Sequence, residues 1–258
     1  MRKQLFIKVN FVKKINPTVY LLAFKSPYIT KVAKPGQFIH IKIDEVFLRR
    51  PFSIHNIKNN TVYILFSVRG RGTQKLSKYK KNDTLDIIGP LGNGFDYKNS
   101  DKKINLLIAG GMGVAPLVFL AKKLNMIKRD CKNIVILGVK NKMNLLCKKE
   151  FEKLNFSVYI SSEDGSFGYK GTAVSLLRVL LKKEKIEKAQ IYACGPKEMF
   201  YQINKVLRNY PHINCQVSFE QFMGCGLGIC CGCVIQTKEG YKKVCIDGPV
   251  FDLKRVYA

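Results

Sequence analysis

The first hundred residues alternate short apolar stretches with turn residues. Six stretches of strand length run through residues 1–97, separated by residues such as Pro35, Gly36 and the pair Asn59 and Asn60. Short strands at this spacing are typical of antiparallel sheets that close into a barrel. We therefore expect an antiparallel β-barrel domain over residues 1–97.

A different rhythm begins near residue 103. Four fully apolar stretches (104–110, 133–139, 156–161 and 189–195) alternate with stretches of helical character that begin near Pro116, Asn144, Thr172 and Pro196. Buried strands that alternate with helices predict a parallel, doubly wound α/β sheet. We assign this domain to residues 98–210.

After Pro211 the chain becomes irregular and rich in glycine and cysteine. Residues 211–258 are too few to build a hydrophobic core of their own, so we expect them to fold around a bound group. The pattern thus predicts three parts: a barrel, an α/β domain and a small C-terminal module.

The charge of the chain changes this picture little. The 258 residues include 36 lysines and nine arginines against 18 acidic residues, which gives a formal net charge of +27. Such an excess of positive charge makes nucleic acids, anionic membranes and acidic proteins candidate partners. The lysines are spread along the whole chain and no nucleic-acid-binding signature is present, which favours a solvated basic surface and no nucleic-acid partner.

Two features bear on the compartment. The N-terminal residues lack the apolar core and cleavage site of a signal peptide, so we expect a cytoplasmic protein. Residues 104–121 reach the length of a membrane-spanning helix, with Asn105 as a polar interruption. Gly110, Gly111 and Pro116 would break such a helix, so we interpret the segment as a strand followed by a helix start and expect no membrane contact.

Four cysteines near the C-terminus carry the strongest chemical signature. Cys225, Cys230 and Cys233 are spaced C-x4-C-x2-C, and eleven residues separate Cys233 from Cys245. Three nearby thiolates and a distant one are typical of a plant-type [2Fe–2S] site, and the interspersed glycines let the backbone approach the sulfides. Zinc is the alternative, although it usually recruits two C-x2-C pairs. Cys231 adjoins Cys230 but gives spacings that fit no such pattern.

A glycine-rich turn, GGMGVAP at residues 110–116, follows the first apolar strand of the α/β domain. A strand, a bare turn and a helix start in this order suit the binding of a pyrophosphate, with a simple packing turn as the alternative. Asp130 precedes the next strand rather than ending it, so the turn differs from the usual Rossmann fingerprint.

Two further loops end strands of the same predicted sheet. Cys194, Gly195 and Pro196 end the fourth apolar stretch, which we take as the last parallel strand, and Glu163 with Asp164 follow the third. Ligands of such sheets bind at the carboxyl edge of the strands. The acidic pair could contact a ribose, or could belong to a solvated loop.

A compact polar and aromatic motif stands in the barrel part. Residues 50–53 (RPFS) join a cation, a proline, a flat ring and a hydroxyl, and residues 70–73 (GRGT) add a small-residue turn. Such groups can clamp a diphosphate and flank an isoalloxazine ring, with an ordinary strand start as the alternative.

The order of RPFS, GRGT, GPLGNGF, GGMGVAP, CGP and a cysteine loop ending in CIDGPVF resembles one family across essentially the whole chain. It is similar to the electron-transfer subunits of dihydroorotate dehydrogenase B, in the ferredoxin-NADP reductase superfamily. The resemblance implies a six-stranded FAD-binding barrel, an NAD-binding α/β domain and a C-terminal [2Fe–2S] module. It also implies an FMN-containing catalytic partner of TIM-barrel fold, in a heterotetramer with two copies of each subunit.

The resemblance also assigns residues. It implies an FAD site of Arg50, Pro51, Phe52, Ser53, Leu65, Phe66, Ser67, Gly72 and Thr73. It implies a nicotinamide site of Gly111, Gly113, Pro116, Cys194, Gly195 and Pro196, and cluster ligands Cys225, Cys230, Cys233 and Cys245. The family often has an arginine where Ser67 stands, a place that Arg69 or Arg71 could take.

The function implied is electron relay from dihydroorotate, through FMN on the partner, the cluster and FAD, to NAD⁺ in pyrimidine synthesis. A relay needs no general base or catalytic triad, and we expect none. The scarcity of arginine near the ribose favours NAD over NADP. Alternatives are a subunit of a sulfide dehydrogenase or NADH/ferredoxin oxidoreductase, and a basic zinc protein that binds nucleic acid.

Overall fold

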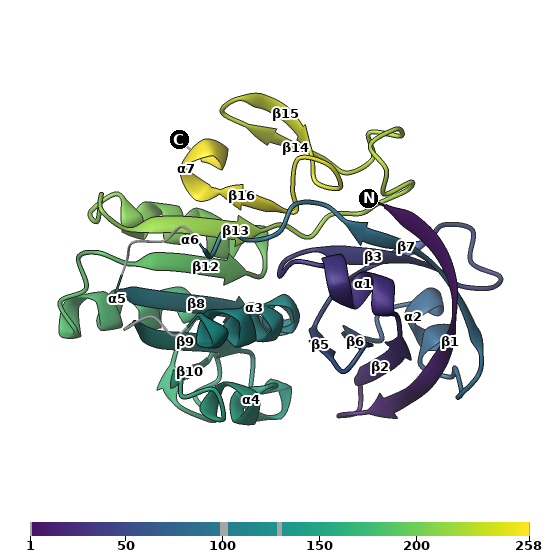
Figure 1. Cartoon of the computed structure of the whole chain (residues 1–258). Helices are drawn as coiled ribbons and strands as arrows, with labels where there is room; N and C mark the ends of the chain where they lie inside the picture. Colours follow the sequence, from purple (N-terminus) through teal and green to yellow (C-terminus); the bar gives the residue numbers. More distant parts are fainter. Residues whose placement is uncertain (1, 99–102, 128–130, 258) are drawn as a thin grey trace.

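Two sheets stand side by side, and a smaller C-terminal part lies above the place where they meet (Figure 1). The computed structural model describes residues 2–98, 103–127 and 131–257. Within these residues the chain runs from the antiparallel sheet, through the mostly parallel one, to the C-terminal part.

The N-terminal sheet curls on itself. Its elements are β1 (Lys3–Lys14), β2 (Val19–Lys25), α1 (Pro27–Val32), β3 (Phe38–Lys42), β4 (Arg50–Ser53), β5 (Asn56–Lys58), β6 (Thr61–Ser67), α2 (Arg71–Leu76) and β7 (Thr84–Leu91). The strand order is β4-β3-β7-β1-β2-β6-β5. Residues 3–8 of β1 pair with β7 and residues 9–14 pair with β2, with a register shift between Val9 and Phe11. Such a bulge bends a strand, and here it turns the corner of the sheet.

Side chains bring the two ends of this sheet together. Phe52 of β4 lies edge-on to Phe66 of β6, with ring centroids 5.6 Å apart. The predicted antiparallel barrel is confirmed, with seven strands where the resemblance implies six, because the three-residue β5 pairs beside β6.

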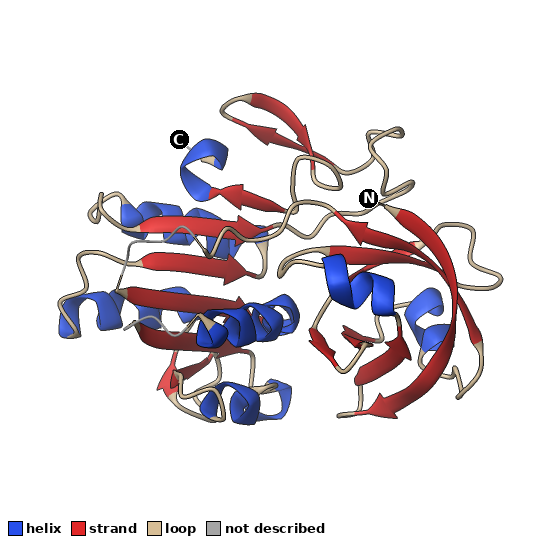
Figure 2. Cartoon of the chain, viewed as in Figure 1, coloured by secondary structure: helices blue, strands red, loops and turns tan. Residues whose placement is uncertain are grey.

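The middle of the chain forms a parallel sheet with helices on both faces, as predicted (Figure 2). Its elements are β8 (Ile104–Gly110), η1 (Gly111–Gly113), α3 (Val114–Met126), β9 (Lys132–Val139), η2 (Lys142–Asn144), α4 (Lys148–Glu152), β10 (Ser157–Ser162), β11 (Tyr169–Lys170), α5 (Ala173–Lys183), β12 (Gln190–Cys194) and α6 (Lys197–Leu207). The strand order begins β11-β10-β9-β8-β12, so the direction of winding reverses at β8. In such sheets ligands bind at the carboxyl ends of the strands beside the reversal.

Two strands extend this sheet beyond the predicted ones. β13 (Asn214–Ser218) pairs in parallel with β12, and β16 (Val250–Asp252) pairs antiparallel with β13. Our prediction that Cys194 ends the last parallel strand is therefore wrong. Asn214 and Gln216 interrupt the apolar pattern of β13 and hide this strand in the sequence.

The C-terminal part packs on both sheets. It contains the hairpin of β14 (Val234–Thr237) and β15 (Gly240–Lys243), and ends in α7 (Leu253–Val256). Its buried side chains, among them Cys233, Val244 and Cys245, join a core that also holds Phe38 and Leu91 of the barrel. The module thus shares its hydrophobic core with its neighbours, and our expectation that it folds around a bound group stays a prediction.

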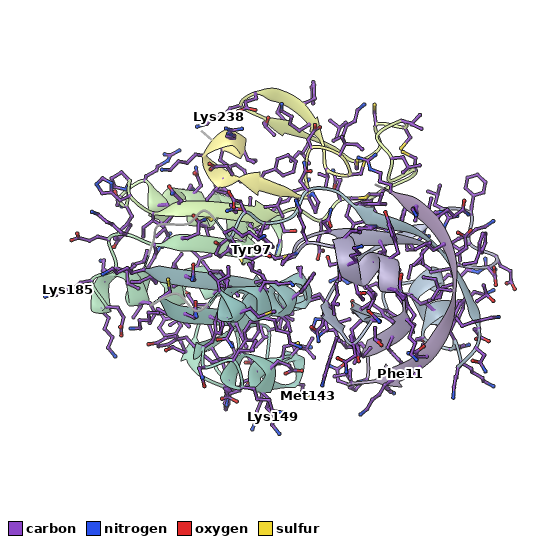
Figure 3. The ribbon with its side chains drawn as sticks, in the orientation of Figure 1. Phe11, Tyr97, Met143, Lys149, Lys185 and Lys238 are labelled. Atoms are coloured by element: carbon purple, nitrogen blue, oxygen red, sulfur yellow. The ribbon has the colours of Figure 1, made fainter. Side chains whose placement is uncertain are left out.

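Residues 104–121 form β8, η1 and the first part of α3, in agreement with the interpretation as strand and helix start. In the described parts of the chain no helix is long and apolar enough to cross a membrane. Lys149 of α4, Lys185 after α5 and Lys238 between β14 and β15 project outward at the periphery of the fold (Figure 3).

Candidate functional site

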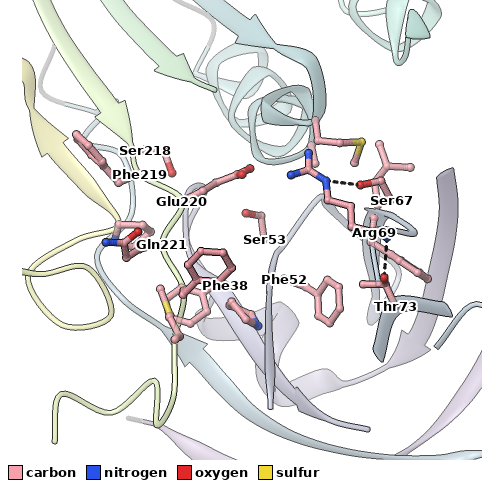
Figure 4. Close-up of a pocket in the computed structure, with 18 residues that line it drawn as sticks. Phe38, Phe52, Ser53, Ser67, Arg69, Thr73, Ser218, Phe219, Glu220 and Gln221 are labelled. Atoms are coloured by element: carbon pink, nitrogen blue, oxygen red, sulfur yellow. Dashed lines mark hydrogen bonds between the residues drawn. The ribbon is translucent and has the colours of Figure 1, made fainter. Parts of the chain in front are cut away.

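A cavity of about 400 Å³ opens where the barrel, the α/β domain and the C-terminal part meet (Figure 4). Seven predicted flavin residues line it: Pro51, Phe52, Ser53, Leu65, Phe66, Ser67 and Thr73. Met112 and Ala115 line it from the α/β domain, and residues 218–223 line it from the end of β13 and the chain that follows. A cleft of this size, mostly apolar with a few polar groups, is the usual form of a cofactor site.

Aromatic packing fixes the barrel wall of the cavity. Phe66 is held between Phe52 and Tyr20, whose ring lies roughly parallel to it at a centroid distance of 6.0 Å. Both phenylalanines are more than nine-tenths buried. Because their rings are packed from behind, they present a rigid surface to anything that enters the cavity.

Arg50 and Gly72, the other two predicted flavin residues, lie together outside the lining. Nη1 of Arg50 donates to the backbone oxygens of Leu48 and Arg49, at 2.8 and 3.2 Å. A Cβ on Gly72 would lie 3.4 Å from Nε of Arg50. The guanidinium is therefore held by backbone groups, in contact with the turn that carries Gly72.

Arg69 supplies a cation to the cavity. Its Nε donates to Ser67 Oγ at 3.1 Å, and its backbone N–H donates to Thr73 Oγ1 at 2.9 Å. Arg71 is absent from the lining, and its charge acts on Glu45 instead. Of the two predicted substitutes for a family arginine at Ser67, Arg69 has the suitable position.

The glycine-rich segment of residues 110–116, termed the dinucleotide turn, packs against the loop after β12. A Cβ on Gly113 would lie 2.0 Å from the carbonyl oxygen of Cys194, and one on Gly195 would lie 3.1 Å from Cα of Gly110. Glycine is required for this close approach. The structure thus brings together the predicted residues of both loops at the point where the sheet winding reverses.

The dinucleotide turn is also tied to the barrel. Nδ1 of the buried His55 donates to the carbonyl oxygen of Ala115 at 2.8 Å, in the first turn of α3 next to the buried Pro116. Burial lowers the pKa of His55 to about 4, so the ring is neutral near pH 7. Burial likewise raises the pKa of the Cys194 thiol, which is therefore protonated.

Glu163 and Asp164 follow β10 at the same edge of the sheet, two strands from the dinucleotide turn. The Asp164 carboxylate accepts the backbone N–H of Ser166 at 2.9 Å, and hydrogen bonds from Ser166 lower its pKa. Asp130 lies outside the described residues. The acidic pair therefore presents negative charge at the edge where a ribose would lie.

Glu220 was missed by our sequence interpretation. It follows β13 and faces Arg69 across the cavity (Figure 4). The surrounding walls desolvate its carboxyl and raise its pKa, against the opposing effect of the Arg69 charge. Glu220 could have been found if β13 had been recognised as a parallel strand, because the carboxyl end of that strand points at the cavity.

The four predicted cluster ligands form two pairs of thiols. The backbone N–H groups of Cys225 and Cys230 each donate to the sulfur of the other at 3.4 Å. Cys233 and Cys245 are both buried, and the backbone N–H of Val244, next to Cys245, donates to the carbonyl oxygen of Cys233 at 3.1 Å. Among the described residues no three His, Cys, Asp or Glu side chains converge on a single ion. Two pairs suit a two-iron cluster with four thiolates.

Backbone donors surround the first pair. Although burial raises the pKa of Cys225, N–H donation from Cys230, Leu227 and Ile229 outweighs it and lowers the pKa to about 6. Burial raises the pKa of Cys245 to about 12, with the Cys233 thiol as a further cause. A segment that aims N–H groups at sulfur is suited to anionic thiolates and sulfides.

A buried histidine supports this segment, residues 224–233, which we term the cluster loop. His40 of β3 is fully buried, and a Cβ on Gly226 would lie 2.6 Å from its Nδ1. Burial lowers the pKa of His40 to about 4, partly offset by the backbone of Cys225 and Arg49. Neither ring nitrogen reaches hydrogen-bond geometry with a described residue. A lone histidine in the apolar strand FIHIK gives no sequence signal for such a contact.

Comparison with known families matches two parts of the chain. Residues 107–205 match the oxidoreductase NAD-binding domain, and residues 220–257 match the iron-sulfur cluster binding domain of dihydroorotate dehydrogenase B. Curated relatives named dihydroorotate dehydrogenase B (NAD(+)), electron transfer subunit, match almost the whole chain, and two of them serve as examples. The one from Desulforamulus reducens is 37% identical over 97% of both chains. The one from Enterococcus faecalis is 36% identical over 99% of this chain and 98% of its own.

Solved structures agree with the fold. An NADH-dependent reduced ferredoxin-NADP oxidoreductase, studied for flavin-based electron bifurcation, superposes with a TM-score of 0.85 at 29% identity, over 97% of this chain and 89% of the other. A ferredoxin NADP⁺ reductase from Neisseria gonorrhoeae, solved with FAD and NADP, gives a TM-score of 0.71 at 18% identity, over 84% of this chain and 99% of the other.

Proposed function

This chain belongs to the family of dihydroorotate dehydrogenase B electron-transfer subunits, and on that premise we propose that it passes electrons from a catalytic partner, through a [2Fe–2S] cluster and FAD, to NAD⁺ in pyrimidine synthesis. The predicted partner is the FMN-containing dihydroorotate dehydrogenase subunit, in a complex of two plus two chains. The electron-transfer and NAD-linked oxidoreductase role follows from the family.

One observation carries the proposal. The barrel wall, the dinucleotide turn and the residues before the cluster loop line a single cavity. A flavin in this cavity would meet a nicotinamide on the side of Met112 and Ala115, and a cluster on the side of Phe222 and Met223. Electron relay requires this order of neighbours, with the flavin in the middle.

The residues of this chain have binding and orienting roles in the proposal. Bound FAD exchanges two electrons with a nicotinamide and single electrons with an iron–sulfur cluster. Phe52 and Phe66 form the barrel side of the cavity, and Arg50 with the turn of Gly72 would hold the diphosphate outside this lining. Cys225, Cys230, Cys233 and Cys245 hold the cluster.

Glu163 and Asp164 support NAD over NADP. Their carboxylates stand at the carboxyl edge of the sheet, where a 2′-phosphate would meet like charge and a free ribose hydroxyl could donate a hydrogen bond. Replacing Glu163 by serine and Asp164 by arginine should therefore raise the rate of NADP⁺ reduction relative to that of NAD⁺.

The partner should cover the cluster loop. Phe222 lies just before this loop and Ile229 lies within it, and the two residues are 92% and 80% exposed. Large apolar side chains left in water often mark contact sites. A catalytic subunit seated there would bring its own flavin near the cluster and exclude water from it.

The test uses the chain co-expressed with a dihydroorotate dehydrogenase catalytic subunit and purified without oxygen. We expect a stable complex in equal proportion, a flavin and iron–sulfur spectrum, and NAD⁺ reduction that depends on dihydroorotate. A colourless, zinc-containing product would overturn the cofactor assignment. An intact flavin and cluster with no dihydroorotate-dependent NAD⁺ reduction would overturn the partner assignment.

A second function has support from the solved relative at 29% identity, which is an NADH-dependent reduced ferredoxin-NADP oxidoreductase. In that case the chain would exchange electrons between NADH and ferredoxin within another complex. NADH-dependent ferredoxin reduction that exceeds dihydroorotate-dependent NAD⁺ reduction would favour this alternative.

A further inference from the structure

Lys243 joins the C-terminal hairpin to the cluster loop. It is the last residue of β15, two positions before Cys245, and its side chain is half-buried. Its Nζ donates to the carbonyl oxygen of Gly228, in the middle of the cluster loop, at 2.8 Å. Its backbone N–H donates to Asp247 Oδ2 at 2.6 Å, which fixes the lysine from the other side.

The peptide that Lys243 contacts lies between two donors to sulfur. The carbonyl of Gly228 belongs to the peptide group that joins Gly228 and Ile229, and the N–H groups of Leu227 and Cys230 on either side of it donate to Cys225 Sγ at 3.3 and 3.4 Å. The ammonium therefore polarises a peptide that lies between the two N–H donors to a proposed cluster ligand. Hydrogen bonds in such a chain strengthen one another, and a charged donor has the largest effect.

Gly228 also lies close to the second pair of thiols, because it packs against Ile246, the residue that follows Cys245. Its φ is +86°, and a Cβ here would lie 2.6 Å from Cγ1 of Ile246. This backbone conformation needs glycine. A single residue held by Lys243 thus faces both pairs of proposed cluster ligands.

We propose that Lys243 sets the reduction potential of the cluster by polarising the Gly228–Ile229 peptide and placing a positive charge beside the ligands. The inference rests on the proposed function, since it takes Cys225 and Cys245 as ligands. On reduction the cluster gains one electron from the donor and no bond changes. A nearby cation and stronger N–H···S bonds both favour the more negative state. Lys243 is a positioning residue that acts through the peptide.

The neighbouring lysine provides a matched control. Lys242 carries the same charge one residue earlier on β15, but its Nζ pairs with Glu239 within the hairpin at 3.5 Å. Because side chains alternate along a strand, Lys242 faces away from the cluster loop. Removing the Lys242 charge changes the net charge by the same amount as removing the Lys243 charge, but it leaves the contact between Lys243 and Gly228 intact.

The experiment measures the potential of the cluster in the co-purified complex by EPR-monitored titration with dithionite. For Lys243→Met we expect the equilibrium constant for reduction to fall about tenfold, roughly 59 mV for one electron. Lys243→Gln keeps a hydrogen-bond donor without the charge, so its equilibrium constant should fall by less. For Lys243→Arg the constant should stay near the wild-type value, and for Lys242→Met it should change less than twofold.

Iron, sulfide and flavin analysis of each variant separates the possible failures. A wild-type complex without iron and sulfide overturns the proposed function itself. A fully loaded Lys243→Met variant whose potential moves no more than that of Lys242→Met overturns the role of Lys243. If the methionine variant loses its cluster, the loaded Lys243→Gln variant decides, and an unchanged potential there overturns the inference.

Discussion

The dinucleotide turn and the cluster loop are both rich in glycine, but different forces hold them. The dinucleotide turn runs directly from β8 into α3, and its residues Val114 and Ala115 are buried. The cluster loop lies within residues 219–233, where the structure describes no helix or strand, and it exposes Ile229. The fold therefore preorganises the turn, whereas hydrogen bonds to sulfur, one lysine and the contact of Gly226 with His40 hold the loop.

This difference indicates that the loop depends on its ligand and the turn does not. Packing of a strand and a helix survives the loss of a small molecule, because the buried area is unchanged. A loop held by N–H···S bonds loses most of its support once the thiolates have no iron, since metal binding and local folding are coupled.

Removal of iron and sulfide should give the largest effect. We expect the amides of Leu227 and Cys230, which donate to Cys225, to exchange with deuterium at least about 1000-fold faster in the apo chain. Peptides from β8 and α3 should exchange at an unchanged rate. Hydrogen exchange with mass spectrometry measures both regions at once, and equal protection of the loop in both forms would contradict the comparison.

Gly226→Ala should give the second-largest effect, a loss of the cluster. The φ of Gly226 is +69°, and an added Cβ would overlap the ring of the buried His40. The strain and the overlap together should cost about 3–4 kcal/mol in the loop. We expect iron and sulfide contents near zero with FAD retained.

Gly232→Ala is the control for that substitution. A Cβ at Gly232 would have Cys230 Sγ as its nearest described neighbour, at 3.6 Å, which is an ordinary contact. This variant should keep its cluster. Similar iron contents in both variants would show that His40 does not constrain the loop.

The same contrast explains which features the sequence could predict. The strand of residues 104–110 and the turn after it were predicted because a continuous apolar run and adjacent glycines are local signals. The spacing of the four cysteines is equally local, and the family match over residues 220–257 agrees with a cluster-binding domain. The assignment of individual ligands stays a prediction.

Features that depend on distant contacts were not predictable. β13 was missed because polar residues interrupt its five positions, and Glu220 was missed with it. The contact of His40 with the cluster loop joins residues almost two hundred positions apart, and the link from Lys243 to Gly228 needs the hairpin to be folded. Neither pair leaves a periodic pattern in the sequence.

The free energy of unfolding should depend on pH through His55, which joins the dinucleotide turn to the barrel. The pKa of His55 is about 4 in the folded chain, below its ordinary value of 6.5, because the ring is buried. Between these values the unfolded chain binds a proton that the folded chain does not. The stabilisation is complete above pH 6.5 and is lost as the pH falls toward 4, by about 2–3 kcal/mol.

Urea unfolding midpoints above pH 6.5 and near pH 4 measure this loss. His55→Asn keeps a donor for the Ala115 carbonyl and removes the titrating ring, so its midpoint should depend less on pH. Lys122, whose charge also disfavours protonated His55, is unchanged in this variant. Identical pH dependence in both proteins would mean that His55 is not the titrating group.

Arg50→Ala should give the smallest effect. It tests whether a change in the barrel weakens FAD binding without affecting the dinucleotide turn or the cluster loop. Backbone oxygens of Leu48 and Arg49 orient the guanidinium before any ligand arrives, so its loss removes a charge-assisted contact without disturbing the core. We expect FAD to bind about tenfold more weakly, or about 1.4 kcal/mol. Arg71→Ala, which removes a charge that acts on Glu45, should bind FAD normally. Because the cluster loop does not depend on Arg50, iron content should stay at the wild-type level, and flavin retained equally by both variants through gel filtration would argue against the clamp.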